Sequence, residues 1–576
     1  MRWEIGFVFV LLAWPFLVSG QTDSLNTQNI TVIGSYNPAV TQALKLRTLP
    51  VLNNTEALQK IPVQYRFITV PVASTFTPSK GKAAGLERRE PEHNYNSFAS
   101  LAMGYFFTSQ ADLYTGLNFD RGSKRLDLGL HHKSALAQLK FSPLPTAFYQ
   151  SHLNAAWSHR ERDFNWKLAA DIGHNLQHWY GLVYRSNETD FTDSLDVAQY
   201  YLTGHLFGKI KFEDSFVKDA SVQAQTISDA TSASESSLHS DFNLEFPVRD
   251  YFGTIGTFVD VVQGRMGNAP VSELDNSGTF NYGRLQLGIR PGLRFDRKAL
   301  RLFVGANLVY ATDLEIQEGS LYVYPNLSGD INLSDKALVA FASLDGSLTQ
   351  NSFQDYARQN PFISPTLLIR PTDTKYHFNG GFRGQLKGVF GYALHANYEV
   401  QQNAPLFMLN PVNEMRTDAK AYNFGNSFQV VYQDFNTLGF TAEIQWMVNR
   451  NFNLQLSGSI YEYESNANAV VYNLPNHEAN LLLDFRPESG WGFWMRFILM
   501  GERQDLMTSA TVSFLATPLV LDAYFDASTQ LSYRINTKWN AFLQANNVLN
   551  TNYQRWAHFP VQGFQLLGGV GYRFDW

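Results

Sequence analysis

The chain has 576 residues, a formal net charge of −6 and 17% charged residues, without a basic run, which argues against a nucleic-acid partner. Its 44% of hydrophobic residues exclude a disordered chain, and the absence of cysteine excludes disulfides, thiol catalysis and cysteine-ligated metals. Aromatic residues make up 14% of the chain, which is typical of proteins with aromatic girdles at membrane interfaces.

Residues 1–20 predict a cleaved secretory signal peptide. One arginine precedes an apolar run from Ile5 to Val18, and Val18-Ser19-Gly20 provides the small residues of a cleavage site. The run is about 14 residues long, whereas a membrane-spanning helix needs roughly 20. A retained N-terminal anchor is therefore the less favoured alternative, and the mature chain is expected to begin at Gln21.

Residues 21–95 differ in composition from the rest of the chain. They are rich in proline and contain the charged, turn-prone stretch Ser79–Glu90. This segment is too short and too often interrupted by proline to form a sizeable domain of its own. We expect an extended segment. It would lie in the periplasm or, if the rest of the chain forms a barrel as argued below, fold back into the lumen of that barrel.

From Asn96 to Trp576 the sequence alternates between apolar and polar residues. The stretch FNLQLSGSI at 452–460, for example, places apolar residues on one face and amide and hydroxyl side chains on the other. Such segments are strands, and their length of roughly ten residues suffices to cross a bilayer. We count about 22 of them, within a range of roughly 20 to 24.

The connections between these segments alternate between short and long. The turns at 486–490 and 535–538 are tight, whereas 502–518 and 550–563 are long and polar. Outer-membrane barrels have short periplasmic turns and long extracellular loops. The sequence therefore predicts an all-β fold in which 96–576 form a transmembrane, antiparallel, up-and-down β-barrel. A soluble sandwich or propeller is disfavoured by the strand length and by the absence of a fixed blade repeat.

Counting strands backwards from Trp576 predicts the topology. The count puts the loops at 464–475, 502–518 and 550–563 outside the cell, and the turns near Arg450, Pro487 and Asn536 inside. It also makes 401–421 periplasmic, where turns should be short. We favour the interpretation that this stretch folds into the lumen as a partial gate. The alternative is that the strand count has missed a strand pairing near Leu406–Leu409.

Near the C-terminus, NNVLNTNY at 546–553 and LGGVGYRF at 567–574 resemble the end of the barrel of TonB-dependent receptors. These are large active transporters in the outer membrane of Gram-negative bacteria. The resemblance implies that the last strand is read by the barrel-assembly machinery. The residues expected to carry that signal are Gly569, Tyr572, Phe574 and Trp576.

The same family has an N-terminal plug inside the barrel, preceded by a short box that contacts an energy-transducing periplasmic protein. The resemblance would place such a box at Ile30, Thr31, Val32 and Ile33, although an ordinary extended segment is the alternative. Residues 21–95 are too few for a complete plug, so the resemblance leaves energised transport open.

Two functions are consistent with the sequence. The first is transport of a solute across the outer membrane, through a lumen restricted by 21–95 and the loops. The second is a non-transporting structural or binding subunit of a larger outer-membrane complex. The expected partners are outer-membrane lipid, the barrel-assembly machinery, and a periplasmic energy-transducing protein or a surface lipoprotein.

No motif points to an enzyme, a cofactor or a metal. His174 and His178 share one face of a strand but would lie roughly 13 Å apart, which is too far to bind one ion. We therefore expect neither catalysis nor a bound cofactor.

Overall fold

The computed structural model describes residues 93–576, except 140–141, 183–194, 268–278, 335, 412–420, 466–468 and 509–515. The predicted signal peptide, the box-like Ile30–Ile33 and residues 21–92 of the extension lie outside the described residues. The barrel belongs to a compact unit, Glu90–Trp576.

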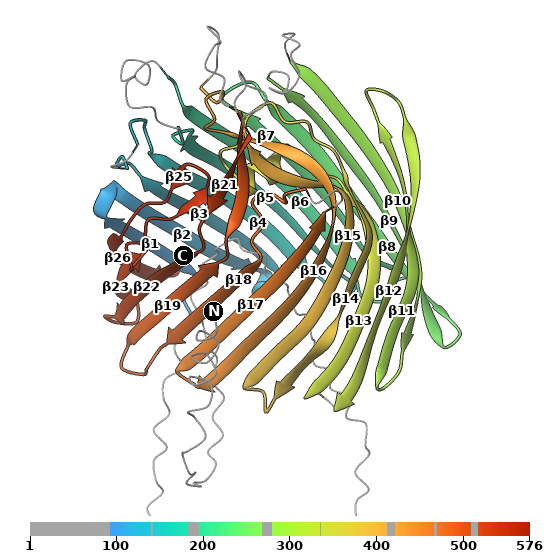
Figure 1. Cartoon of the computed structure of the whole chain (residues 1–576). Helices are drawn as coiled ribbons and strands as arrows, with labels where there is room; N and C mark the ends of the chain where they lie inside the picture. Colours follow the sequence, from blue (N-terminus) through green and yellow to red (C-terminus); the bar gives the residue numbers. More distant parts are fainter. Residues whose placement is uncertain are drawn as a thin grey trace, which may run out of the picture. The chain divides into compact units, whose positions relative to one another are not determined.

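The strands form one 22-stranded antiparallel sheet that closes into a barrel, which confirms the predicted fold class and strand number (Figure 1). The first strands of the sheet are β1 Ser97–Gly104, β2 Thr108–Phe119, β3 Lys124–Ala135, β4 Phe148–Arg160, β5 Phe164–His178, β6 Ala198–Phe212, β7 Val217–Asp229, β8 Ser234–Val248, β9 Tyr251–Met266, β10 Phe280–Asp296 and β11 Leu300–Asp313. The others are β12 Gly319–Ser334, β13 Leu338–Thr349, β14 Thr372–Leu386, β15 Phe390–Leu409, β16 Phe428–Asn449, β17 Phe452–Ser465, β18 His477–Phe485, β19 Trp491–Met500, β22 Tyr524–Arg534, β23 Trp539–Asn546 and β26 Gln565–Phe574.

A few short elements lie in the connections. The strand pairs are β20 Arg503–Thr508 with β21 Ala516–Leu521, and β24 Gln554–Trp556 with β25 Phe559–Pro560. The helical turns are η2 Tyr105–Phe107, η3 Asp120–Gly122 and α3 Phe353–Gln359. Within the described residues, no helix has both the length and the apolar character that a membrane span needs.

The first and last strands close the sheet. β1 pairs antiparallel with β26 from Ser97 opposite Phe574 to Gly104 opposite Leu567. Gly569 lies in this seam, and a Cβ atom there would come 2.3 Å from the Phe542 ring and 2.8 Å from the Ala102 Cβ. A side chain at this position would have to displace the Phe542 ring and crowd Ala102, so the packing in the seam favours glycine.

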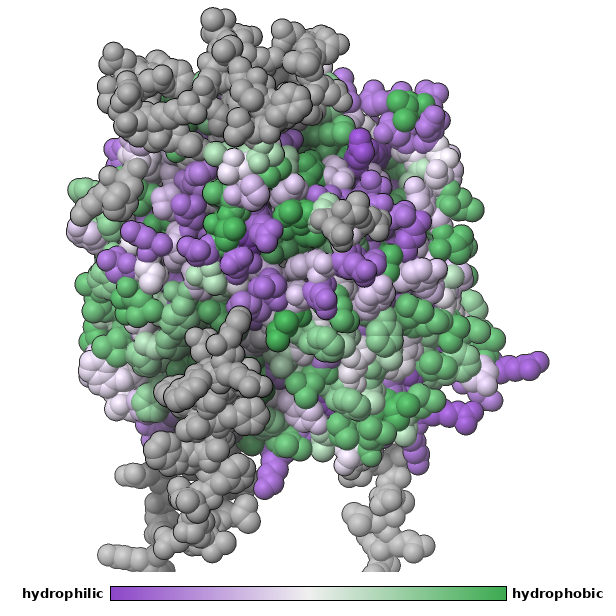
Figure 2. All heavy atoms as spheres, in the orientation of Figure 1, coloured by the Kyte–Doolittle hydropathy of each residue, from purple (hydrophilic) through white to green (hydrophobic). Residues whose placement is uncertain are grey.

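Successive side chains point outward and inward along the wall. On β5, the outward Leu168 and Ile172 are 54% and 56% exposed, whereas Asp171 lies on the opposite face, near His152. Figure 2 shows hydrophobic residues gathered over the lower part of the visible wall, with hydrophilic residues more frequent above. So much exposed apolar surface is expected where a barrel faces lipid.

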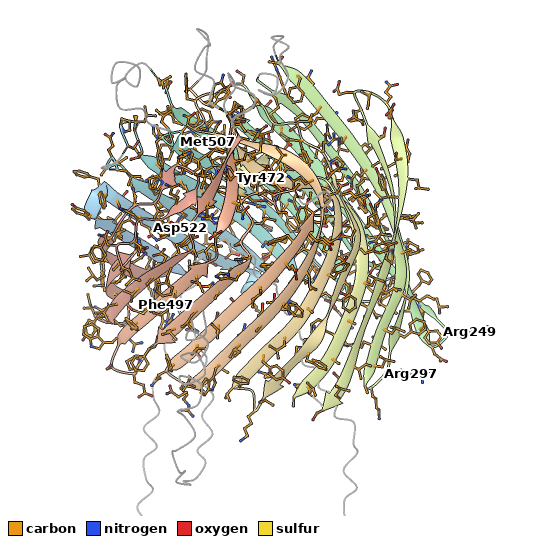
Figure 3. All side chains as sticks on the ribbon, viewed as in Figure 1. Arg249, Arg297, Tyr472, Phe497, Met507 and Asp522 are labelled. Atoms are coloured by element: carbon orange, nitrogen blue, oxygen red, sulfur yellow. The ribbon has the colours of Figure 1, made fainter. Side chains whose placement is uncertain are left out.

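Aromatic side chains gather at the rim with the short turns. Trp491 packs against Tyr533 with ring centroids 4.7 Å apart, and Trp539 against Tyr572 at 4.6 Å. Each of these residues lies at or near the end of its strand, Trp491, Tyr533 and Trp539 beside a short turn and Tyr572 beside the C-terminus. Their position is that of an interfacial girdle. Figure 3 shows the side chains on the tilted strands, with Arg249 and Arg297 in two short turns of this same rim.

The predicted division into two rims is largely confirmed. The turns near Arg450, Pro487 and Asn536 lie on one rim, and the described parts of the loops at 464–475, 502–518 and 550–563 lie on the other. The placement of 401–421 on the short-turn rim is wrong. β15 continues through 401–409 to the long-loop rim and pairs there with the start of β16, as Leu406 opposite Val431 shows.

The error has a physical cause. β15 and β16 are 20 and 22 residues long, about twice the ten that a crossing was assumed to need. A count based on short strands therefore inserts a crossing that does not exist. The alternative pairing near Leu406–Leu409 is the correct one, because Leu409 lies opposite Phe428.

The closing strand generates a test of assembly. Replacing Tyr572 and Phe574 with Asp should place charge on the outward face of β26, at a cost of up to roughly 2 kcal/mol each at depth and less near the interface. We expect loss of heat-modifiable migration on SDS gels and loss of the protein from the outer-membrane fraction. Arg573→Asp, on the opposite face of the same strand, is the control and should still insert.

The two rims generate a test of topology. Single cysteines replacing Glu315 and Glu502, both exposed in long-rim connections, should react with an impermeant maleimide on intact cells. A cysteine replacing Lys387, exposed in the β14–β15 turn, should react only after the cells are broken. Labelling of the Lys387 variant on intact cells would invert the assigned orientation.

Candidate functional site

The connections of the long-loop rim pack on one another through a core of aromatic and aliphatic side chains. We call this assembly the loop cap. It comprises the described parts of the β5–β6, β13–β14, β15–β16, β19–β22 and β23–β26 connections and the adjoining ends of β15 and β16. Its largest aromatic members are Trp179, Tyr180, Phe353, Tyr356, Phe362, Phe407, Tyr422, Phe428, Trp556 and Phe559.

The cap spans the mouth of the barrel. β5 and β15 occupy nearly opposite positions in the closed 22-stranded ring. The loops that follow them nevertheless touch: Trp179 packs on Tyr422 at 5.3 Å, and Asn426 donates a hydrogen bond to the Trp179 carbonyl at 2.7 Å. Contacts between opposite sides of the ring require the chain to cross the opening.

A third loop joins these two. The Phe559 ring, from the β23–β26 connection, stacks on Phe362 of the β13–β14 connection with centroids 3.8 Å apart. The Tyr180 hydroxyl donates to the Pro560 carbonyl at 3.1 Å. Loops from three parts of the ring thus share one core, in which Phe559 is 1% exposed.

A buried carboxylate holds the helix of the cap. Glu235, at the start of β8, is 3% exposed and accepts hydrogen bonds from the Phe353 and Gln354 amides at the first turn of α3. The Tyr282 hydroxyl donates a further bond at 2.7 Å. Ser352 caps the same helix by accepting from the Asp355 amide at 3.0 Å. A carboxylate is stabilised at this position because the free amides and the helix dipole point towards it.

A second buried carboxylate joins three segments of the cap. Asp505, on β20, is 1% exposed and accepts from the Leu409 amide at 3.0 Å and the Asn473 side chain at 2.8 Å. Asn473 also donates to the Phe407 carbonyl at 2.8 Å. Burial raises the pKa of the Asp505 carboxyl, although these hydrogen bonds oppose the shift. The closed cap therefore lowers the preference of Asp505 for its charged form.

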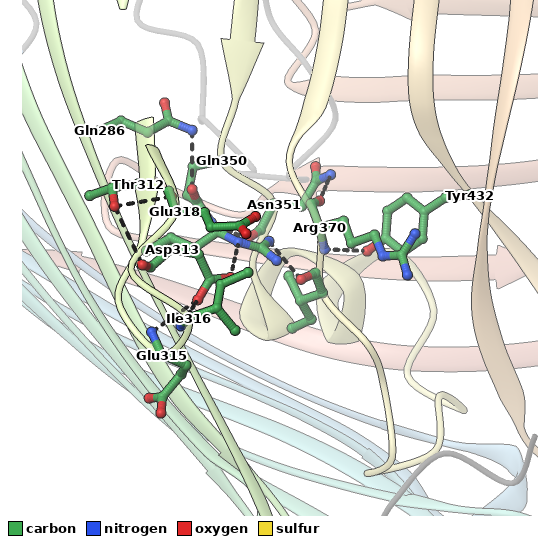
Figure 4. A network of polar contacts seen from close by, with 12 residues as sticks. Gln286, Thr312, Asp313, Glu315, Ile316, Glu318, Gln350, Asn351, Arg370 and Tyr432 are labelled. Atoms are coloured by element: carbon green, nitrogen blue, oxygen red, sulfur yellow. Dashed lines mark hydrogen bonds and ion pairs between the residues drawn. The ribbon is translucent and has the colours of Figure 1, made fainter. Parts of the chain in front are cut away.

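A polar network attaches the α3 loop to the barrel wall (Figure 4). Gln286 of β10 donates to Gln350 at 3.1 Å, and Asn351 donates to the Arg370 carbonyl at 2.7 Å. The Arg370 amide donates to the Tyr432 hydroxyl of β16 at 2.9 Å. These bonds fix both ends of the loop, so the helix is held at a defined position over the mouth.

Below the cap, the inner wall carries paired charges. His239 of β8 lies 3.0 Å from Asp260 and 2.5 Å from Asp241, and Arg290 of β10 pairs with the same Asp241. Asp112 and His131 form another such pair on β2 and β3. The inner wall is polar, and the charges in these two clusters are paired with one another.

The structure does not bring together His174 and His178, the two histidines considered as metal ligands from the sequence. His174 stacks on Tyr200 with centroids 5.9 Å apart, and His178 bonds the Ala147 carbonyl. Among the described residues, no group of three or more His, Cys, Asp or Glu side chains is placed to hold a metal ion. Both histidines have ordinary structural partners.

The C-terminal motif residues have clear structural roles. Asn547 and Asn550 adopt positive φ angles of 45° and 51°, a conformation that asparagine tolerates well. Asn547 bonds the Thr551 and Gln562 carbonyls, and thereby fixes the start of the β23–β26 connection. Beyond the closing strand, the Asp575 carboxylate accepts from the Asn96 amide at 2.9 Å. The assembly signal at Gly569, Tyr572, Phe574 and Trp576 stays a prediction.

Sequence reasoning missed the residues that build the cap. Glu235, Asp505 and Phe353 lie in separate stretches with no local motif around them, because each acts on a partner remote in sequence. One available signal was the density of aromatic residues in the long connections, for example at 553–564.

The Asp505 contacts generate a test of cap stability. Asp505→Ala should leave the Leu409 amide and the Asn473 side chain without their acceptor, at about 1–3 kcal/mol for each buried group. We expect faster amide hydrogen exchange at 404–411, which includes the end of β15, and at 469–476, with exchange in the other strands of the barrel unchanged. Asp522→Ala, at an exposed carboxylate in the same connection, is the matched control. Equal protection in both variants would contradict the role of Asp505.

No family model matches the chain, and no curated protein matches its sequence. Solved structures do match in fold. The pyoverdine receptor FpvA of Pseudomonas aeruginosa bound to pyoverdine superposes with a TM-score of 0.61 and 13% identity, over 84% of this chain and 80% of its own. The FrpB iron transporter of Neisseria meningitidis gives 0.63 and 11%, over 84% and 82%.

The ferric-catecholate import receptor Fiu of E. coli K12 gives a TM-score of 0.59 with 10% identity, over 84% of this chain and 82% of its own. All three are described as receptors or transporters. At such low identity the likeness concerns the fold. The chain has the 22-stranded barrel fold of the TonB-dependent receptors of the Gram-negative outer membrane.

Proposed function

We propose that this protein transports a solute across the outer membrane, through a lumen whose outer mouth is closed by the loop cap. The observation that carries the proposal is the contact of Trp179 with Tyr422 and Asn426 across the ring. A barrel used only as an anchor has no need to bring loops from opposite sides together over a polar lumen. The role is not enzymatic.

The barrel fold supports transport because a sheet of 22 strands encloses a lumen too wide for its own wall side chains to fill. Something must therefore restrict the opening. The cap supplies one barrier, and we propose residues 21–95 as the second. The last residues of that segment contact the short-turn rim: His93 lies 2.5 Å from Asp575, and Tyr95 donates to Thr537 at 3.3 Å.

The proposed partners follow from this role. Outer-membrane lipid surrounds the apolar wall, and the barrel-assembly machinery reads the last strand through Gly569, Tyr572, Phe574 and Trp576. The further partner would be either a periplasmic energy-transducing protein that engages Ile30–Ile33 or a surface lipoprotein that engages the cap. The solved structures with a similar fold are described as a pyoverdine receptor, a ferric-catecholate import receptor and an iron transporter. These descriptions favour import as the direction of transport.

The second candidate function is a non-transporting subunit of a larger outer-membrane complex. The buried bonds of Glu235 and Asp505 favour it, since they make the cap a well-packed surface rather than a loose set of loops. In that case the cap would be a platform for a partner and would not open.

Conductance separates the two functions. Phe362→Ala with Phe559→Ala removes the closest ring stack of the cap, at about 3–5 kcal/mol for each buried ring. We expect larger or more frequent channel openings in planar bilayers than for the native protein. Phe216→Ala, at a 65% exposed ring in a short turn, is the control and should conduct like the native chain.

A chain lacking residues 21–92 belongs in the same experiment. If the cap and the N-terminal segment both restrict the lumen, the cap variant and the truncation together should conduct more than either alone. An unchanged conductance in all of these chains would favour the structural subunit.

A further inference from the structure

A polar cavity of about 280 Å³ opens in the wall formed by β13, β14 and β15. Its volume is close to the roughly 300 Å³ at which small-molecule sites begin. Its upper margin includes Asn351 and Thr372, which adjoin the α3 loop, and Asn351 donates to the Thr372 hydroxyl at 2.8 Å. The cavity therefore lies next to the loop cap.

Irregular strand pairing hollows the wall at this level. The register shifts between Asp345 and Ser347 on β13, between Thr374 and Tyr376 on β14, and between Gln401 and Ala404 on β15. Such bulges disrupt the ladder and redirect side chains, and they recur beside binding and active sites. Three of them on adjoining strand pairs create the recess.

The lining has a distinct chemistry. Hydroxyl and amide groups that both donate and accept come from Ser347, Thr349, Thr372, Thr374, Asn351 and Gln401. Two carboxylates, Asp345 and Glu399, flank His377 across the three strands. No lysine or arginine is among these lining residues, all of which belong to the described part of the chain.

Among the described residues, only one of the two carboxylates forms an ion pair. Asp345 pairs with the His377 ring at 3.3 Å. Glu399 accepts only a long hydrogen bond from the Thr374 hydroxyl, at 3.5 Å, and no ion pair within 4.0 Å reaches it from the described residues. Glu399 is half-buried and shares the nearby His377 with Asp345, so its charge is only partly compensated. A partly buried carboxylate is stabilised by a further positive group. A ligand can supply that group.

We propose that this cavity binds a small solute carrying a protonated amine and several hydroxyl groups, such as an amino sugar, with the amine at Glu399. The hydroxyl and amide side chains would bond the solute's hydroxyls, and His377 would keep Asp345 compensated. The inference rests on the proposed function only in treating the ligand as a transported solute. Binding is measurable whether or not the cap opens.

Calorimetric titration of the purified full chain in detergent tests the proposal, with glucosamine and glucose as probes. The two sugars have similar size and hydroxyl content, but only glucosamine carries the amine. We expect saturable glucosamine binding and at least about tenfold weaker glucose binding, since a charge-assisted hydrogen bond is worth about 1.5 kcal/mol or more.

Variants locate the site. Glu399→Gln should weaken glucosamine binding about tenfold while leaving glucose unchanged, because it removes the charge and keeps the shape. Thr374→Val, which keeps all charges, should weaken both sugars. Glu443→Gln is the matched control: this glutamate faces inward on β16, outside the cavity, and its replacement should change nothing. Heat-modifiable migration checks that each variant is folded.

Equal affinity for the two sugars, no saturable binding of either, or loss of binding in Glu443→Gln would overturn the proposal. Failure here with a positive conductance result leaves transport standing and removes only this ligand class. Binding without any conductance change removes transport and leaves the site.

Discussion

Closure of the sheet is the constraint on which the rest of this structure depends. Hydrocarbon offers no partner for a backbone amide or carbonyl, so a strand edge cannot be left open in a bilayer. β1 and β26 come from opposite ends of the described chain and must pair along their whole length. That pairing explains why glycine stands at Gly569 and why the strand pattern continues almost to the last residue.

Closure with 22 strands creates a second problem, which is the width of the lumen. The inner wall carries paired charges, such as those around His239 and Asp241. Long connections cover the outer mouth, and their aromatic residues would otherwise be exposed to water. By packing Trp179 on Tyr422 and Phe362 on Phe559, the loops bury their own apolar surface and cover the opening at the same time.

Buried polar groups make the cap specific. A purely apolar cluster could pack in several arrangements, whereas Glu235 bonds the first turn of α3 and the Tyr282 hydroxyl, and Asp505 bonds a particular amide of β15. Such groups are costly unless fully bonded, so they favour one arrangement over others.

The sequence by itself determined the barrel. Alternation with a period of two reports which face of each strand meets lipid, and this is a local property that needs no knowledge of neighbours. It yielded the fold class, the strand number and the division into two rims. It failed at β15 and β16, because strand length beyond the membrane is set by what the strand packs against and not by alternation.

Only the tertiary structure decided the cap and the wall cavity. Glu235 and Phe353 are more than a hundred residues apart, as are Trp179 and Asn426, and no spacing rule links them. Likewise Asp345, His377 and Glu399 become neighbours only through the register of three strands, which the bulges shift. Alternation specifies the face of a side chain but not its height in the wall, because that height depends on pairing between segments distant in sequence.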